Sequence, residues 1–274
     1  SATINANITL PSTLGQTITN YNNAYEIFYA STINGNLTIE NDFLPNIANT
    51  EFMFASARCN GNLTIGDNFA QNATSGFEMF YNVNADGSIV IENNFLTKAT
   101  NASLMFYNAT ISGNFNVENN FMPKITNIHE MFYEATLPNN FSLPDGFGSV
   151  ALDMSLMFFR ATLPTEFDLP DGFGSVATDM NTMFYGTSLP DGFTLPAGFG
   201  SAATNMNSMF YGATLNGDID WSCTDFTAST ANKSGMFNST TWNGHFILAQ
   251  NQTSVDWLID GTGATAANVK VKGS

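Results

Sequence analysis

Two apolar residues recur together at a nearly constant interval along the chain. A phenylalanine preceded by Met or Ile returns at a step of 26, with one final step of 27. These phenylalanines are Phe28, Phe54, Phe80, Phe106, Phe132, Phe158, Phe184, Phe210 and Phe237. A period held so closely is typical of a solenoid in which each repeat forms one rung. We number the residues of each repeat from this phenylalanine, which is position 0.

The residues around position 0 follow a helical spacing. Near the middle of the chain, Ile128, Met131, Phe132 and Ala135 lie at i, i+3, i+4 and i+7, on one face of a helix. Just upstream, the side chain of Asn127 can accept a hydrogen bond from an amide of a first helical turn. The pattern predicts a helix or helical segment of about two turns in every rung.

The spacing changes to a period of two at positions +9 and +11. The apolar pairs there are Leu37 and Ile39, Leu63 and Ile65, Ile89 and Ile91, Phe115 and Val117, Phe141 and Leu143, Phe167 and Leu169, Phe193 and Leu195, Ile219 and Trp221, and Phe246 and Leu248. Alternation over a short run predicts a strand. In five repeats a glycine at position +7 marks the turn before it: Gly35, Gly61, Gly87, Gly113 and Gly217.

The two ends of the chain predict the limits of the stack. The segment Ile8–Leu10 predicts a first strand, and Val269 and Val271 predict a last one, whose two lysines discourage edge-to-edge pairing. We therefore expect one elongated domain. It has an N-terminal half-repeat cap over residues 1–27, a nine-repeat solenoid over 28–248 and a C-terminal cap or edge strand over 249–274.

Composition and charge narrow the possible partners. Of the 274 residues, 43% are apolar and 25 are Phe, which is enough for a core. Seven Lys and Arg against 23 Asp and Glu give a net charge of −16, which repels nucleic acid and anionic lipid headgroups. No apolar run is long enough to span a bilayer as a helix, so we expect no membrane insertion. No signal-peptide pattern follows Ser1, so we expect a mature product or a chain that never carried a leader.

The chain offers few residues for catalysis. Its two histidines, His129 and His245, lie four repeats apart, and we expect no Ser-His-Asp or Cys-His group to form between them. The two cysteines, Cys59 and Cys223, lie about 30 Å apart at one strand spacing per rung, so we expect them to be unpaired. Cys and His show no metal-ligand spacing. We expect no enzyme activity and no resident cofactor.

Two rows of side chains are candidate binding surfaces. Position +1 carries Tyr29, Tyr81, Tyr107, Tyr133, Tyr185 and Tyr211, whose rings suit sugar or protein recognition but also suit stacking between rungs. Positions +8 and +10, which point outward from the predicted strand, are polar and include Asn114, Asn116, Asn140 and Ser142. The sheet face of a solenoid is often its binding face, although one face of any sheet is solvated.

A weaker candidate is a calcium site. Glu92 and Glu118 hold position +12 on adjacent rungs, so their carboxylates should stand about 5 Å apart. Neighbouring Asn side chains supply further oxygen ligands of the kind that calcium prefers. The alternative is that both glutamates are simply solvated at a strand end.

The later repeats resemble a known family. The units TDMNTMFYGTSL, TNMNSMFYGATLNGDIDW and SGMFNSTTWNG are similar to the bacterial surface protein 26-residue repeat, the BspA-like leucine-rich-repeat family. The resemblance implies a right-handed α/β stack with a parallel sheet on one face and short helices or turns on the other. The first four repeats fit the leucine-rich-repeat core, with Asp42, Asn68, Asn94 and Asn120 at its Asn position. In the next three repeats Gly146, Gly172 and Gly198 take that place, and we expect the turn there to be made differently, with Gly at positive φ.

The same resemblance implies a function class. Members of the family are surface or secreted proteins, so we expect a noncatalytic adhesion module at the cell surface or outside the cell. Its partner would be a glycan or a surface protein, with self-association as a further option. The alternative is a structural or host-recognition fibre or decoration protein of a virus particle, because similar repeats occur in virus-encoded fibres.

Overall fold

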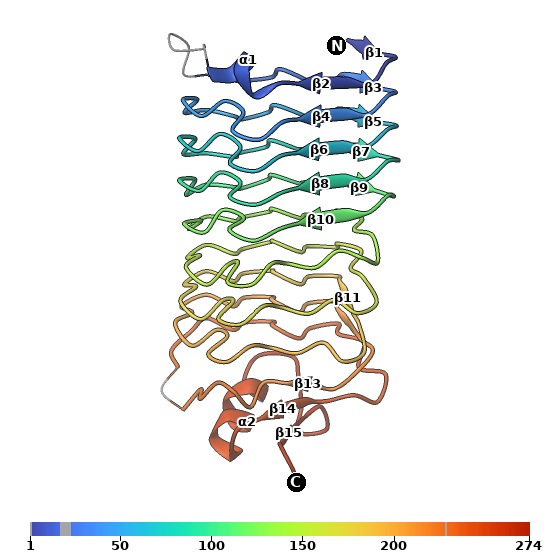
Figure 1. The fold of residues 1–274 in the computed structure, drawn as a ribbon. Coiled ribbons are helices and arrows are strands. Elements are labelled where there is room, and N and C mark those ends of the chain that lie inside the picture. Colours follow the sequence, from blue (N-terminus) through green and yellow to red (C-terminus); the bar gives the residue numbers. More distant parts are fainter. Residues whose placement is uncertain (1, 17–22, 228) are drawn as a thin grey trace.

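The protein forms a parallel β-solenoid of about ten turns (Figure 1). The computed structural model describes residues 2–16, 23–227 and 229–274. The predicted repeat stack is therefore confirmed, but the count of nine rungs is too low. The N-terminal segment adds strands of its own to the stack, and the C-terminal segment adds a last strand.

Each early turn contributes one strand to each of two parallel sheets. The first sheet runs β1 (Thr3–Ile4), β3 (Thr32–Ile33), β5 (Arg58–Cys59), β7 (Asn84–Ala85) and β9 (Thr110–Ile111). The second runs β2 (Ile8–Leu10), β4 (Leu37–Ile39), β6 (Leu63–Ile65), β8 (Ile89–Ile91) and β10 (Phe115–Val117). From β3 onward, each residue of the two sheets pairs with its equivalent in the next repeat. The sequence predicted only the second sheet.

The later turns form two smaller sheets. They are β11 (Ser188–Leu189) paired with β12 (Thr214–Leu215), and β13 (Ile219–Asp220), β14 (Ile247–Ala249) and β15 (Val269–Val271) in a second group. Between Val117 and Ser188 the described residues form only isolated bridges. Prolines such as Pro144 and Pro170 stand beside the predicted strands there, and proline cannot donate to a sheet ladder. The strands predicted at positions +9 and +11 of these repeats are therefore wrong, although their apolar residues are buried.

The helices predicted around position 0 are absent. Within the described residues, the helices are α1 (Ser12–Gln16) and α2 (Gln252–Ile259) near the two ends. At position 0 the amide of Phe54 donates to the carbonyl of Met79 on the next rung at 2.8 Å, while the amide of Ala55 donates locally to Phe52 at 3.0 Å. Phe52 and Ser56 adopt left-handed φ values of 57° and 56°. Every second amide of the segment thus donates to a carbonyl of the next rung. In an α-helix, these amides would donate to carbonyls within the helix.

The expected side-chain acceptors before this segment do exist, but they form turns instead of helix caps. Asn127 Oδ1 accepts from the amide of His129 at 3.0 Å, and Asp179 Oδ1 accepts from Asn181 at the same distance. The residues equivalent to Asn127 form isolated parallel β-bridges from each rung to the next, from Asn23 to Asn232. These bridges make a third column of backbone contacts beside the two sheets. The α/β class is therefore incorrect, and the rungs are made of strands and turns.

One backbone conformation serves the Asn and the Gly repeats at position +14. Asp42, Asn68, Asn94 and Asn120 have φ values of 57° to 62°, and Gly146, Gly172 and Gly198 have values of 74° to 76°. The positive φ predicted for the glycines is confirmed. The hydrogen bonds of the turn do differ, as predicted: the amide of Asn68 donates to Asn93 on the next rung, whereas in the Gly repeats the amide of Phe147 donates locally to Pro144. Asn and Asp tolerate this region better than other side chains, and here each Asn Nδ2 also donates to the side-chain oxygen of the rung before it at 2.9 Å.

Phenylalanine rings form much of the core, in files that run along the stack. The rings at position 0 stack from Phe28 to Phe237 with centroid distances of 4.9 to 5.6 Å. A second file, at position +15, begins with Phe43, Phe69 and Phe95, whose centroids lie 6.3 and 5.5 Å apart. Each ring therefore packs on the rungs before and after it, which makes the core continuous along the stack.

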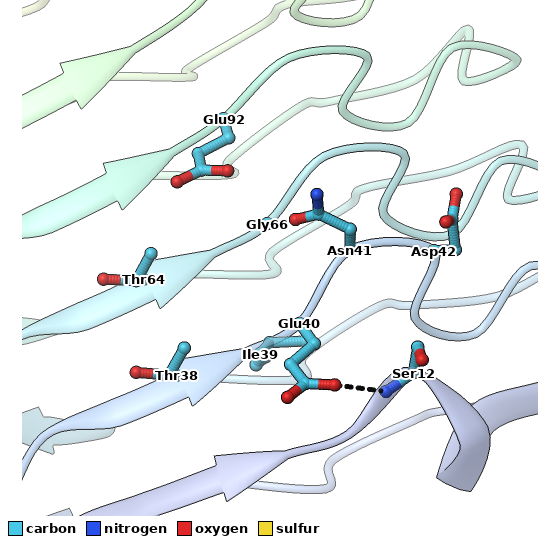
Figure 2. Close-up of a pocket in the computed structure, with 9 residues that line it drawn as sticks. All are labelled: Ser12, Thr38, Ile39, Glu40, Asn41, Asp42, Thr64, Gly66 and Glu92. Atoms are coloured by element: carbon cyan, nitrogen blue, oxygen red, sulfur yellow. Dashed lines mark hydrogen bonds between the residues drawn. The ribbon is translucent and has the colours of Figure 1, made fainter.

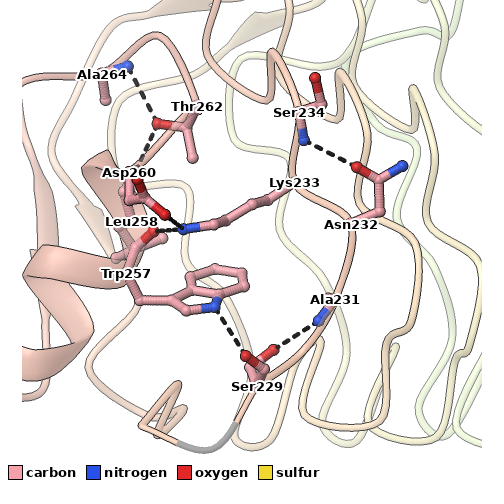
Figure 3. Close-up of polar contacts among 10 residues, drawn as sticks. All are labelled: Ser229, Ala231, Asn232, Lys233, Ser234, Trp257, Leu258, Asp260, Thr262 and Ala264. Atoms are coloured by element: carbon pink, nitrogen blue, oxygen red, sulfur yellow. Dashed lines mark hydrogen bonds and ion pairs between the residues drawn. The ribbon is translucent and has the colours of Figure 1, made fainter.

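Near the C-terminal end, α2 packs against an earlier rung (Figure 3). Trp257 stacks on Phe226 at 4.5 Å, and its indole N–H donates to the Ser229 carbonyl at 3.1 Å. Lys233 Nζ donates to the Trp257 carbonyl and lies 3.3 Å from Asp260 Oδ2. These contacts join the last helix to the preceding rung and cover the end of the core.

Candidate functional site: the lateral faces

The tyrosines at position +1 stack face to face with their neighbours. We call the six rings Tyr81, Tyr107, Tyr133, Phe159, Tyr185 and Tyr211 the ring stack. Successive centroids lie 4.5 to 5.0 Å apart with interplanar angles of 4° to 16°. Tyr29 stays outside it and is 43% exposed, because Ala55 occupies the position between Tyr29 and Tyr81. The inclusion of Phe159 was missed, although its place one repeat after Tyr133 was visible in the sequence.

This stacking limits what the ring stack can bind. All six rings are half-buried, and each interior ring has both faces covered by its neighbours. A sugar that packs on an aromatic ring needs a free face, and only the edges of these rings remain for solvent. The geometry favours the second of the two interpretations, in which the rings seal the edge of the core.

The environment of the ring stack changes the acidity of its hydroxyls. Burial, followed by the neighbouring Tyr133 and Tyr81, raises the pKa of Tyr107 to about 12. The pKa of Tyr133 is also raised, first by burial and then by Glu134 and Glu130. Both effects disfavour a phenolate inside the stack.

We expect Tyr107 to make stability depend on pH in alkaline solution. Folding raises its pKa from 10.0 to about 12, so between these pH values the folded protein keeps a proton that the unfolded chain releases. This contribution is complete below pH 10 and is lost as the pH rises toward about 12. In urea unfolding across this window, Tyr107→Phe should lose stability less steeply than the wild type. Tyr29→Phe, at the same repeat position outside the ring stack, is the control, and equal slopes for Tyr107→Phe and the wild type would contradict the assignment.

The polar strand face lies on the outer side of the second sheet. We use this name for the outward residues at positions +8 and +10. At +8, the side-chain oxygens of Asn36 and Asn62 accept from the backbone amides of Asn62 and Ser88 on the next rung, both at 2.9 Å. These side chains therefore fix the register of the stack while facing solvent.

The four predicted binding residues of this face, Asn114, Asn116, Asn140 and Ser142, are all exposed. Asn140 Nδ2 donates to Asn116 Oδ1 at 2.7 Å, and Asn140 Oδ1 accepts from the amide of Phe115 at 3.2 Å. The structure thus brings Asn116 and Asn140 together across two rungs. The group lies beside β10, where the regular sheet ends.

The calcium candidates, Glu92 and Glu118, directly follow β8 and β10 of the second sheet. A hollow of about 370 Å³ lies between Glu40 and Glu92, two rungs apart, where Gly66 takes position +12 of the rung between them (Figure 2). Glu40 Oε2 accepts from the amide of Ser12 at 3.1 Å. Glu92 is half-buried and lines the hollow, whereas Glu118 is exposed and does not. The described residues contain no group of three or more His, Cys, Asp or Glu that could hold a metal ion.

Asp153, Ser155 and His129 are in contact, in a group that includes only one of the two histidines. Ser155 Oγ lies 2.5 Å from Asp153 Oδ1 and 2.7 Å from His129 Nδ1. His129 and Ser155 are one repeat apart, so the repeat spacing itself places them on adjacent rungs. The hydroxyl lies between carboxylate and imidazole, whereas a catalytic triad has the imidazole in the middle. Ser103 and Asn101 repeat the hydroxyl-to-Asx bond at 2.8 Å, so the arrangement is a repeated turn motif.

Both cysteines are free, as expected. Cys59 is buried, which raises the pKa of its thiol to about 11 and makes it a poor nucleophile. Cys223 is exposed, and its Sγ lies 3.3 Å from the Pro196 carbonyl. Neither thiol contacts a histidine in the described part of the chain.

Comparisons with family models, curated proteins and solved structures find no match to this chain. Among the described residues, neither helix has the length and apolar character needed to cross a bilayer.

Proposed function

We propose that the protein is a noncatalytic extracellular binding module that recognises a repetitive glycan or a surface protein through the polar strand face. The observation that carries this proposal is the register of the second sheet. Each outward residue pairs with its equivalent on the next rung, as in Thr38 with Thr64. The same side-chain position therefore returns at the strand spacing of about 4.8 Å.

The chemistry of this face suits such a ligand. The amides of Asn114, Asn116 and Asn140 and the hydroxyl of Ser142 are exposed and offer both donors and acceptors. A ligand with its own repeat can meet several equivalent positions at once, and weak contacts then add through multivalency. The ring stack is a poorer candidate, because its ring faces are covered.

Two further observations support this class of function. The last repeats resemble BspA-like surface proteins in sequence, and a net charge of −16 disfavours nucleic acid as the partner. A site for catalysis requires a few dissimilar groups that converge on one point, and the outward columns of this solenoid repeat similar groups instead.

The proposal is tested with a screen of glycans and cell surfaces against two matched variants. The first changes Asn114, Asn116, Asn140 and Ser142 to Ala on the polar strand face. The second changes Tyr107, Tyr133 and Tyr185 to Phe, which keeps the ring stack and removes its hydroxyls. We expect about tenfold weaker binding or complete loss in the first variant only, because several hydrogen bonds are lost together.

Three outcomes would contradict the proposal. Loss of binding in the Phe variant alone would assign the function to the hydroxyls of the ring stack. Equal binding by both variants and the wild type would exclude both faces. Absence of binding, together with isolation of the protein as part of a larger particle, would favour the structural role in a virus particle.

A further inference from the structure

A second hollow lies on the first-sheet side of the later rungs, outside the polar strand face. It has a volume of about 410 Å³ and spans three successive rungs near β11. Leu163, Pro164 and Pro190 supply apolar surface, while Arg160, Ser188 and Asn216 supply polar groups. Asn216 Nδ2 donates to Ser188 Oγ at 3.0 Å, so two of these polar groups are already held in place.

A missing side chain creates this hollow. Position +2 carries Glu134 and Arg160 on two successive rungs and then Gly186 on the next. Gly186 has a φ of +65°, and a Cβ there would lie 3.0 Å from Arg160 Cγ. The glycine therefore leaves room for the aliphatic part of Arg160 and keeps the surface beside it open.

Arg160 lines this hollow, and its guanidinium lies beside two aromatic rings. Its Cζ lies 5.2 Å from the centroid of Phe159 and 5.8 Å from that of Tyr185, both in the ring stack. Its Nη1 lies 3.9 Å from Glu134 Oε1, which is beyond hydrogen-bond distance. No other polar contact of this guanidinium occurs within the described residues, so its N–H donors remain available to a ligand. The protein has only one other arginine, Arg58.

We propose that this hollow binds a single uronic acid unit within a mostly neutral polysaccharide, because the net charge of −16 repels a densely anionic chain. A guanidinium presents a planar fork of donors that matches a carboxylate, and contact with the edges of two stacked rings restricts its orientation before binding. Leu163 and Pro190 offer an apolar surface for the C–H face of a pyranose ring, and Thr162, which also lines the hollow, carries a hydroxyl that can bond to a sugar hydroxyl. The carboxylate supplies the charge that a neutral sugar lacks.

The test uses a trimer of galacturonic acid as the probe and its methyl ester as the matched neutral ligand. Titrations followed by backbone amide NMR shifts should map binding of the acid to Gly186 and Ser188. Arg160→Gln should weaken binding about tenfold or more, as expected for loss of a charge-assisted hydrogen bond. Ser188→Phe, which fills the hollow from an exposed position, should weaken it as well. Arg58→Gln removes the same charge elsewhere and should bind as the wild type does.

Several results would overturn this inference. They are unchanged binding by Arg160→Gln, equal binding of the methyl ester, equal weakening by Arg58→Gln, or amide shifts that map to the polar strand face. An acidic peptide that binds at Gly186 and Ser188 when the trimer does not would assign the hollow to a protein partner. Thermal melts of each variant separate a lost site from a lost fold. Failure here leaves the proposed function standing, because that function is tested with variants on the other sheet.

Discussion

Replacing Phe132 with Ala should lower the free energy of unfolding by about 3 to 5 kcal/mol. Phe132 is 1% exposed and stands in the middle of the position 0 file. Its ring lies 5.4 Å from Phe106, 5.6 Å from Phe158 and 5.5 Å from Phe141, so the substitution empties a site shared by neighbouring rungs. The rigid rung spacing limits how far the surroundings can collapse into the cavity. Urea unfolding of the variant and the wild type measures the difference.

The adjacent residue provides the control. Tyr133→Ala removes a half-buried ring that stacks 4.6 Å from Tyr107 and 4.5 Å from Phe159, so it should cost clearly less than Phe132→Ala. If both variants lost equal stability, the assignment of Phe132 to the inside and Tyr133 to the edge would be wrong.

Replacing Gly87 with Ala should destabilise the fold by roughly 3 kcal/mol, at the upper end of the range for overpacking. A Cβ at this position would lie 2.2 Å from the carbonyl oxygen of Gly61 and 2.4 Å from its carbonyl carbon, both on the preceding rung. These are backbone atoms, so the clash can be relieved only by separating two rungs of a hydrogen-bonded ladder. The thermal midpoint of the variant should fall accordingly.

Gly146→Ala is the matched control for this prediction. Gly146 has a φ of +74°, and a Cβ there would meet no atom within 4 Å. Gly146→Ala should lower the free energy of unfolding by only about 1 kcal/mol, which is the cost of placing an alanine in the left-handed conformation. A loss for Gly87→Ala no larger than this would mean that the rungs can separate easily at the turn before the strand.

The apolar pattern of the sequence determined the repeat, the core and several strands. The constant interval between phenylalanines predicted a stack with one rung per repeat. Burial of Met131, Phe132 and Ala135 followed from their spacing. The strands predicted at Ile8–Leu10 and Val269–Val271 are also present, although Ile8–Leu10 is the second strand and not the first. These features depend on which side chains avoid water, and the order of residues is enough to reveal them.

The tertiary structure alone decided how the backbone bonds are satisfied. The spacing around Phe54 suits a helix, but its amide finds its acceptor at Met79 on the next rung, far away along the chain. The same cause produced the first sheet, whose two-residue strands are too short for a visible alternation. A local pattern determines which face of a segment is buried. It does not determine where the backbone amides find their hydrogen-bond acceptors, because an acceptor in the same segment and one on a neighbouring rung can leave the same face buried.

The candidate sites, too, were determined partly by the sequence and partly by the tertiary structure. The repeat positions of the tyrosines and of Asn114, Asn116, Asn140 and Ser142 were visible in the sequence, and the structure left the polar group exposed while covering the ring faces. The hollow beside Arg160 was not predicted, because it arises from a glycine on one rung next to a long side chain on another. Sequence periodicity identifies which positions align between rungs, but the space between their side chains depends on their sizes, rotamers and partners in three dimensions.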